Sequence, residues 1–197
     1  MSQNPSSQPV ISISYNRFLD PIFVGWIRAQ PQWKDWEAPS IEDVRASVAR
    51  YKNEWERVAP MVLAGICRAT GLSFVRNHID VFVVSGNPRP FSRPIVIKSR
   101  YTNEEFLCVL AHELIHCLFS DNRVTEDRKD PYPENMHILV HALLWHVYVD
   151  VLGEPNLLET NRRTSSAGTH SEYAEAWRRV EEIGYGEVIR RFREMGR

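Results

Sequence analysis

Two histidines and a glutamate lie close together in the segment His112-Glu113-Leu114-Ile115-His116. On a helix, residues four apart lie on one face, one turn above each other, so His112 and His116 can bind one ion. Glu113 projects roughly a hundred degrees round from His112, which places it beside a metal-bound water rather than on the metal. Zinc lowers the pKa of such a water towards neutrality, and a neighbouring carboxylate can accept its proton as the water attacks a carbonyl. This spacing predicts a hydrolytic zinc site.

The motif requires a helix, and the surrounding sequence predicts one. Thr102 and Glu105 have the pattern of a capping box, with Thr102 at the N-cap. Apolar residues then occupy almost every side of the segment, and Ser120-Asp121-Asn122 marks its end. A helix that is apolar all round belongs in the middle of a domain, where histidines and a glutamate need polar partners. We therefore favour a metal site over a core helix that carries the motif by chance.

Three segments have the pattern of strands and predict a small sheet. Val10–Tyr15 alternates apolar residues with serine, and Ile79–Ser85 is a continuous apolar run of the buried type. Pro94–Ser99 is the third, and it directly precedes the motif helix. Its leading proline favours an edge position, because proline cannot donate a hydrogen bond to a strand ladder.

Helical patterns precede and separate these strands. Phe18–Ala29 predicts a short helix, and residues 40–71 predict a long amphipathic one that Pro60 should kink or split. The loop between them carries Trp33 and Trp36, which we expect to pack over the core rather than to form a binding patch. Together with the sheet, these helices indicate the α+β class.

The C-terminal half is predicted to be helical with polar connections. Glu134–Leu152 has the pattern of a strong helix, and Gly153 follows its end. Asn161–Gly168 is polar and is expected to be a loop. His170–Glu182 and Glu187–Met195 are predicted to be two short closing helices. The helix Glu134–Leu152 is expected to run behind the motif helix and to close the metal site.

Composition bounds the classes of function. The chain has 197 residues, a net charge of −1, 43% hydrophobic and 25% charged residues, which gives no support for a nucleic-acid or anionic-membrane partner. No apolar run approaches the roughly eighteen residues of a membrane span. Residues 1–9 lack the features of a signal peptide and are expected to be a disordered tail before a single domain, residues 10–197. Three cysteines in apolar helical patterns, Cys67, Cys108 and Cys117, fit free thiols and a cytoplasmic location.

A catalytic zinc site normally has three protein ligands and an open position for water, so the motif needs a third ligand from elsewhere. The predicted helix Glu134–Leu152 offers Glu134, His137 and His141 at positions i, i+3 and i+7, on one face. Three polar groups on one face of an otherwise apolar helix indicate that this face meets something polar. From the spacing alone, each of the three remains a candidate.

The motif and the helix that follows it resemble the zincin metallopeptidases, and within them the gluzincin branch. In that branch a downstream helix supplies a glutamate ligand, followed one turn later by an aspartate that orients the first histidine. The closest pattern here is His137 with His141 at i+4, so the resemblance implies that His137 binds zinc and that His141 supports a ligand or contacts the oxyanion. Glu134 has Ile138 at that position, which cannot act as the aspartate does. The resemblance covers roughly Ile79–Leu152, and the third ligand is where the chain departs from the family pattern.

This resemblance implies a zinc-dependent metallopeptidase with peptide or protein substrates. Glu113 would be the general base towards the water and then the proton donor to the leaving amine. In zincins the edge strand beside the active-site helix holds an extended peptide by strand addition, which suits the order of Pro94–Ser99 and the motif helix. Peptide deformylases share the motif but take a cysteine ligand from a separate segment, whereas Cys108 lies on the same helix. A non-catalytic metal-binding or regulatory protein with a zincin-like core is the alternative from another class.

Overall fold

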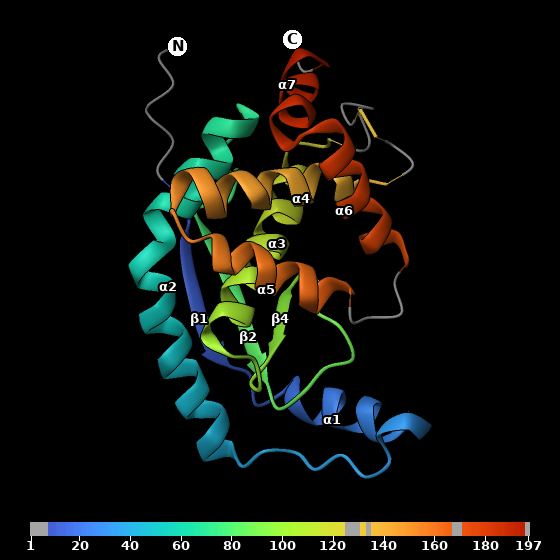
Figure 1. Ribbon diagram of the computed structural model, residues 1–197. Coiled ribbons are helices and arrows are strands. Elements are labelled where there is room, and N and C mark those ends of the chain that lie inside the picture. The colour runs from blue at the N-terminus through green and yellow to red at the C-terminus, as the bar shows by residue number, and fades with distance from the viewer. Residues whose placement is uncertain (1–7, 125–130, 133–134, 167–170, 196–197) are drawn as a thin grey trace.

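Four strands form one mixed sheet within the part of the chain that the computed structural model describes (Figure 1). The described residues are 8–124, 131–132, 135–166 and 171–195. The strands are β1 (Val10–Tyr15), β2 (His78–Val84), β3 (Phe91–Ser92) and β4 (Ile95–Lys98). Their order is β1-β2-β4-β3, with β1, β2 and β4 parallel and β3 antiparallel to β4. The α+β class and the three predicted strands are confirmed.

The edge of the sheet beside the motif helix is β3 rather than β4. The prediction that Pro94–Ser99 lies at the edge was wrong, because β4 pairs on both sides, with β2 and with β3. Pro94 precedes the first residue of β4, so its missing N–H removes nothing from the ladder. The edge position falls instead to a two-residue strand, which is too short to give an alternating pattern.

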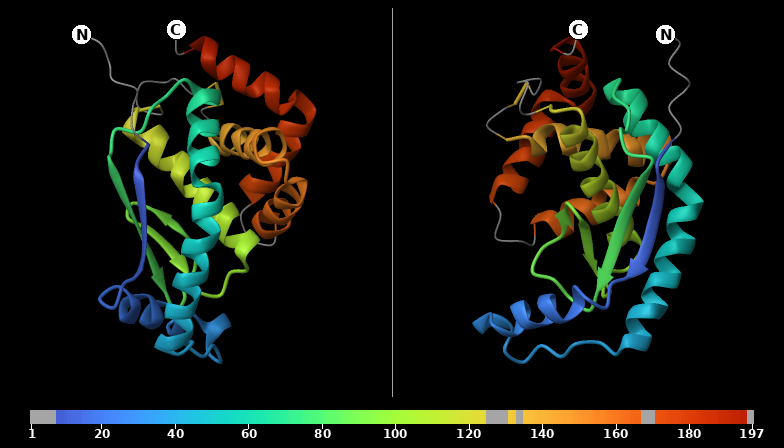
Figure 2. Two further views of the ribbon diagram at one scale, coloured as in Figure 1. Left: turned by 90° about the vertical axis from the view of Figure 1, so that its left-hand side faces the viewer. Right: turned by 180° about the vertical axis from the view of Figure 1, so that it is seen from behind.

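The long helix α2 (Ile41–Thr70) runs along one side of the molecule (Figure 2). Ser40 caps it through a capping box with Asp43, and Gly71 ends it in the left-handed conformation at φ 74°. Of the two expected effects of Pro60, a kink or a split, the split was wrong, since the helix continues through this residue. Proline has no N–H to donate to the carbonyl four residues earlier in the helix. Pro60 is exposed, so water can bind that carbonyl instead.

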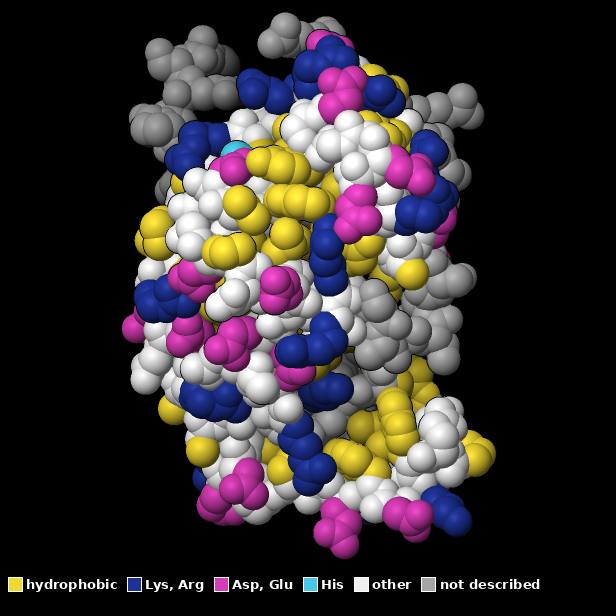
Figure 3. All heavy atoms as spheres, viewed as in Figure 1, with side chains coloured by type: hydrophobic (Ala, Val, Ile, Leu, Met, Phe, Trp, Pro, Cys, Tyr) yellow, Lys and Arg dark blue, Asp and Glu magenta, His cyan; other side chains and the backbone are white. Residues whose placement is uncertain are grey.

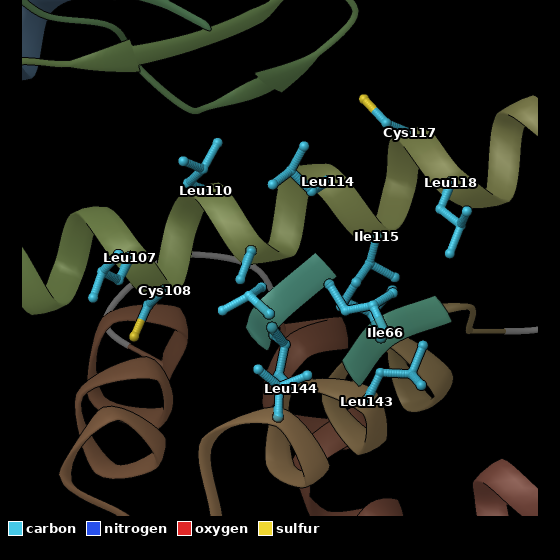
Figure 4. Packing of buried hydrophobic residues seen from close by; sticks show 14 of the residues in the cluster. Ile66, Leu107, Cys108, Leu110, Leu114, Ile115, Cys117, Leu118, Leu143 and Leu144 are labelled. Carbon is cyan, nitrogen blue, oxygen red and sulfur yellow. The ribbon is translucent and has the colours of Figure 1, made fainter. Parts of the chain in front are cut away.

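The motif helix α3 (Asn103–Asp121) lies between the sheet and the other helices. Thr102 and Glu105 form the expected capping box in both directions. Figure 4 shows Leu110 and Leu114 pointing towards the strands, while Ile115 points the opposite way, towards α2 and the C-terminal helices. All three side chains are fully buried. Burial on both sides explains why the helix is apolar almost all round.

Five helical segments follow α3 in the described residues and cover its far side (Figure 2). They are α4 (His137–His146), a π-helical turn η2 (Val147–Val151), α5 (Pro155–Ser166), α6 (Ser171–Ile183) and α7 (Tyr185–Met195). The predicted loop Asn161–Gly168 was wrong over residues 161–166, which belong to α5. Asn161 is polar but buried there, so tertiary packing overrides the local sequence. Within the described residues, no helix combines the length and apolar character that crossing a membrane requires.

The short helix α1 (Asp20–Arg28) is fixed to the ends of the strands by a buried carboxylate. Asp20 accepts hydrogen bonds from the Ser85 backbone N–H at 2.6 Å and from the Tyr15 hydroxyl at 3.0 Å. A 3-10 turn, η1 (Pro31–Trp33), follows α1. Trp36 packs so closely on Gly86 that a Cβ there would lie 2.7 Å from its ring, which agrees with a packing role for this tryptophan.

Candidate metal centre

Three histidine side chains converge between α3 and α4. His112 and His116 lie one turn apart on α3, and His137 is the first residue of α4. One ring nitrogen from each lies within 4.8 Å of the others. The Nε2 atoms of His112 and His116 are 2.9 Å apart, whereas tetrahedral zinc with bonds of about 2.05 Å requires roughly 3.3 Å. The three side chains are therefore close enough together that they could hold a metal ion.

The position of His137 depends on how α4 begins. The Asn135 side chain accepts a hydrogen bond from the His137 backbone N–H at 3.1 Å and donates one to the Glu172 carbonyl at 2.8 Å. These bonds fix the first turn of α4 against α6. The His137 ring consequently lies 5.4 Å from that of His112 and 5.3 Å from that of His116, between centroids.

The environment keeps His112 and His116 neutral, as metal binding requires. Burial, followed by the neighbouring His116, lowers the pKa of His112 well below its usual value. Burial, followed by the neighbouring His137, lowers the pKa of His116 to about 4. Neutral imidazoles present lone pairs rather than protons, and a set of three histidine nitrogens suits zinc.

Glu113 lies beside this group and is not a member of it. Its side chain is buried, and burial raises its pKa to about 7, against the opposing effect of a hydrogen bond from Ser92. The Ser92 hydroxyl, on β3, donates to Oε2 of Glu113 at 2.5 Å. A carboxyl group with a pKa near neutrality can both accept and return a proton at physiological pH. Sequence reasoning missed Ser92, because nothing local relates β3 to the motif helix.

His141 lies one turn beyond His137 and faces the same space. It is fully buried, and neither ring nitrogen has a hydrogen-bond partner among the described residues. Its ring stacks on Trp177 of α6, with centroids 4.2 Å apart and planes 13° apart. Its centroid is 6.0 Å from those of both His112 and His137, so it borders the group without joining it. A buried polar group of this kind calls for a partner that enters the site.

The helix α6 contributes two aromatic side chains beside the histidines, Tyr173 and Trp177, which sequence reasoning missed. The Tyr173 ring lies 4.4 Å from that of His137 and 6.0 Å from that of His112, with the planes close to perpendicular. Burial and, next, the charge of Glu113 raise the pKa of Tyr173. Tyr173 and Trp177 are four residues apart and share a face, which is a signal that the sequence contained. The sequence does not indicate which element the face with Tyr173 and Trp177 contacts.

Several other polar residues of the chain could be considered for the site. The Cys108 thiol is buried and donates to the Leu157 carbonyl at 3.3 Å, so it is a core thiol and has no place in the metal group. The Tyr148 hydroxyl donates to the Cys108 carbonyl at 3.4 Å in the core. His146 pairs with Asp150 on the surface side of α4. Glu134, the carboxylate alternative for the third ligand, and His170 both lie outside the described residues.

We expect the metal-free protein to lose stability steeply as the pH falls from about 6.5 towards 4. The unfolded chain binds protons at its histidines near pH 6.5, whereas burial keeps His112, His116 and His141 unprotonated in the folded state. The stabilisation from such groups is fully present at pH values above the pKa of the unfolded chain. It is lost as the pH falls towards the pKa in the folded state. Glu113 has a raised pKa in the folded state and opposes this trend, because it releases a proton on unfolding in this pH range. The unfolding reaction should therefore take up about two protons in total, three at the histidines less one at Glu113. Urea unfolding in the presence of a chelator, from pH 7 to pH 4.5, measures the slope.

The His116→Ala variant provides the control for this profile. Its stability should fall less steeply over the same range, because one of the three titrating histidines is absent. Replacement of the exposed Met61, which has no titrating group, by serine is the control that should leave the slope unchanged. A flat profile in the unsubstituted protein would contradict the neutral, buried state of the histidine group.

Comparisons with models of protein families, with curated proteins and with solved structures found no match to this chain. The functional argument therefore depends on the geometry of His112, His116, His137 and Glu113, and on the chemistry that this geometry permits.

Proposed function

We propose that this chain is a zinc-dependent hydrolase, and more narrowly a peptidase, whose zinc is held by His112, His116 and His137. The observation that supports the proposal is the convergence of three imidazoles from two helices beside one buried carboxylate. Three nitrogen ligands leave one tetrahedral position open. Zinc, when bound, supplies a Lewis acid that lowers the pKa of water and polarises a carbonyl oxygen.

Glu113 is the proposed catalytic acid and base. Its pKa of about 7 allows it to accept the proton of the attacking water and then to donate that proton to the leaving amine. The hydrogen bond from Ser92 holds one carboxylate oxygen in place and so fixes the direction of the other. This arrangement fits the hydrolysis of an amide bond at neutral pH.

His141 is proposed to donate a hydrogen bond to the oxygen on which negative charge develops, or to hold the ring of His112. Its two ring nitrogens are buried and have no partner among the described residues, while the stack on Trp177 fixes the ring plane. A donor that is already oriented stabilises developing charge without reorganisation. The Tyr173 ring lies on the same side of the site, beside His137.

The outer edge of β3 is proposed to bind the substrate backbone. This role was expected of Pro94–Ser99 but passes to β3, which is the terminal strand of the sheet and contacts Glu113 through Ser92. An extended peptide can pair with such an edge through main-chain hydrogen bonds. The three free cysteines agree with a reducing compartment, and we propose a cytoplasmic location.

The test of the metal site is the zinc content of protein purified without chelator or metal-affinity tag. We expect about one zinc per chain by elemental mass spectrometry, because the site offers three histidine nitrogens close together. The His116→Ala variant, which removes one ligand, should retain none after the same purification. Absence of zinc, together with no uptake of added zinc at neutral pH, would overturn the proposal.

A further inference from the structure

The outer side of α1 carries large apolar side chains that the described part of the chain leaves exposed. Ile22 and Trp26 lie one turn apart on this helix and are 65% and 39% exposed. Phe18, four residues before Ile22, is 73% exposed. Single exposed apolar residues are common, but three on one face of a short segment indicate a contact surface. Figure 3 shows apolar side chains gathered over α1 at the lower right of the molecule.

This surface continues onto the edge strand β3. The rings of Trp26 and Phe91 are 5.9 Å apart, and Phe23 lies 5.6 Å from Phe91 beneath them. Phe91 is the first residue of β3, and its neighbour Ser92 donates to Glu113. The apolar surface therefore begins one residue away from the contact with the proposed catalytic carboxylate.

The two residues of β3 face opposite sides of the sheet. Ser92 reaches Glu113 on α3, whereas Phe91 packs with Phe23, Val84 and Val96 in a separate small cluster. Side chains of a strand that pairs with β3 would alternate in the same way. Those on the side of Ser92 would face the histidines, and those on the side of Phe91 would lie against the surface of α1.

Positive charge borders this surface. Arg89 and Arg93 lie on either side of β3 and are exposed, and the Arg89 guanidinium lies 5.5 Å from the centre of the Phe91 ring. Within the described residues neither arginine makes an ion pair. Arginines at the rim of an apolar surface favour a ligand with carboxylates next to its apolar side chain.

We propose that Phe18, Ile22, Trp26 and Phe91 form a substrate-selecting surface that binds a large apolar side chain of an extended peptide with acidic neighbours. This inference rests on the proposed function, because it takes the occupant to be the substrate segment paired with β3. The strand β3 joins this surface to the metal centre, because Phe91 belongs to the surface and Ser92 contacts Glu113. Specificity would then come from alternate residues of the substrate, those on the side of Phe91.

The first test is direct binding to the zinc-loaded, full-length Glu113→Gln protein, which should not cleave its ligand. The probe is a fluorescein-labelled heptapeptide, Gly-Asp-Gly-Phe-Asp-Gly-Gly, compared with the same peptide carrying glycine in place of phenylalanine. We expect the phenylalanine peptide to bind about tenfold more tightly or better, from burial of the aromatic ring. Ile22→Ser with Trp26→Ser should remove this preference.

A matched control uses two exposed apolar residues elsewhere. Met61 and Val75 are 43% and 69% exposed, and lie on α2 and in the segment before β2. Serine at both should leave the affinities unchanged. Failure of the phenylalanine peptide to bind, equal binding of the two peptides, or an equal effect of the control pair would overturn the inference. A dimer in sedimentation that only the Ile22 and Trp26 pair dissociates would assign the surface to a second copy and overturn it as well.

Cleavage of a peptide library by the zinc-loaded, unsubstituted protein separates this inference from the proposed function. Cleavage with a preference for an apolar residue at one fixed distance from the scissile bond, lost in the Ile22 and Trp26 variant, supports both. Cleavage without that preference overturns the substrate-selecting surface and leaves the peptidase in place. Binding that depends on phenylalanine, without cleavage of any peptide, overturns the peptidase and leaves the peptide-binding surface.

Discussion

Replacement of Glu113 by glutamine is expected to lower kcat/KM for peptide hydrolysis by roughly 10³-fold or more while zinc remains bound. Glutamine has the same shape, and its amide oxygen can still accept the hydrogen bond from Ser92. It cannot accept a proton from the attacking water at neutral pH. The three histidines are untouched, so the metal content should stay at about one zinc per chain. Hydrolysis rates and elemental analysis on the same preparation give both quantities.

Glu104→Gln is the matched control for this substitution. Glu104 lies on the same helix but is exposed in its first turn, away from the histidines. Its replacement should change neither hydrolysis nor zinc content. If Glu113→Gln retained full activity, the general-base role would be wrong. If no hydrolysis were found in the unsubstituted protein although zinc was bound, the non-catalytic metal-binding or regulatory alternative would be favoured.

The helix ends were predictable because their chemistry is local. Ser40 with Asp43, and Thr102 with Glu105, satisfy backbone N–H groups that any helix of this sequence would leave open. Gly71 ends its helix in the left-handed conformation, which glycine adopts readily because it has no side chain. None of these signals depends on the rest of the fold.

The errors concern elements that exist through tertiary contacts. β3 has two residues and is held by its ladder with β4, so it leaves no periodicity to detect. The second half of α5 is polar in sequence, yet its Arg162 guanidinium lies 4.7 Å and 5.1 Å from the ring centres of Trp145 and Trp177. A charged residue between two indole rings is stabilised as part of the packing rather than as a loop residue.

The same distinction applies to the metal centre. His112 and His116 were predictable as a pair, because their spacing of four residues places them on one face of a helix. The contribution of α6 was not predictable, since which faces of α4 and α6 meet depends on the packing of α4 against α3 and of α6 against α5 and α7. His137 was favoured through the resemblance to gluzincins, and the convergence of its ring with the other two supports that choice without testing metal binding.

Replacement of His137 by alanine is expected to lower zinc affinity by well over 100-fold, beyond the 10- to 100-fold that loss of an outer partner typically costs. His137 offers a ring nitrogen within 4.8 Å of those of His112 and His116, so its loss leaves two protein ligands. His141→Ala should lower zinc affinity by at most the 10- to 100-fold typical of an outer partner, because its nitrogens lie outside the group of His112, His116 and His137. Its main effect should be on kcat, through the lost hydrogen bond to the reacting oxygen. Competition with a chromophoric chelator measures the affinities.

His146→Ala is the control on the same helix, since His146 pairs with Asp150 away from the metal centre and should leave zinc affinity unchanged. A larger loss in His141→Ala than in His137→Ala would make His141 the third ligand and require α4 to shift along its axis by about one turn, roughly 6 Å. A large loss in Glu134→Ala, with His137→Ala unaffected, would instead give the site the glutamate ligand of the gluzincins. Because these three substitutions remove different donors from one stretch of chain, their relative affinities identify the third ligand whatever the absolute values are.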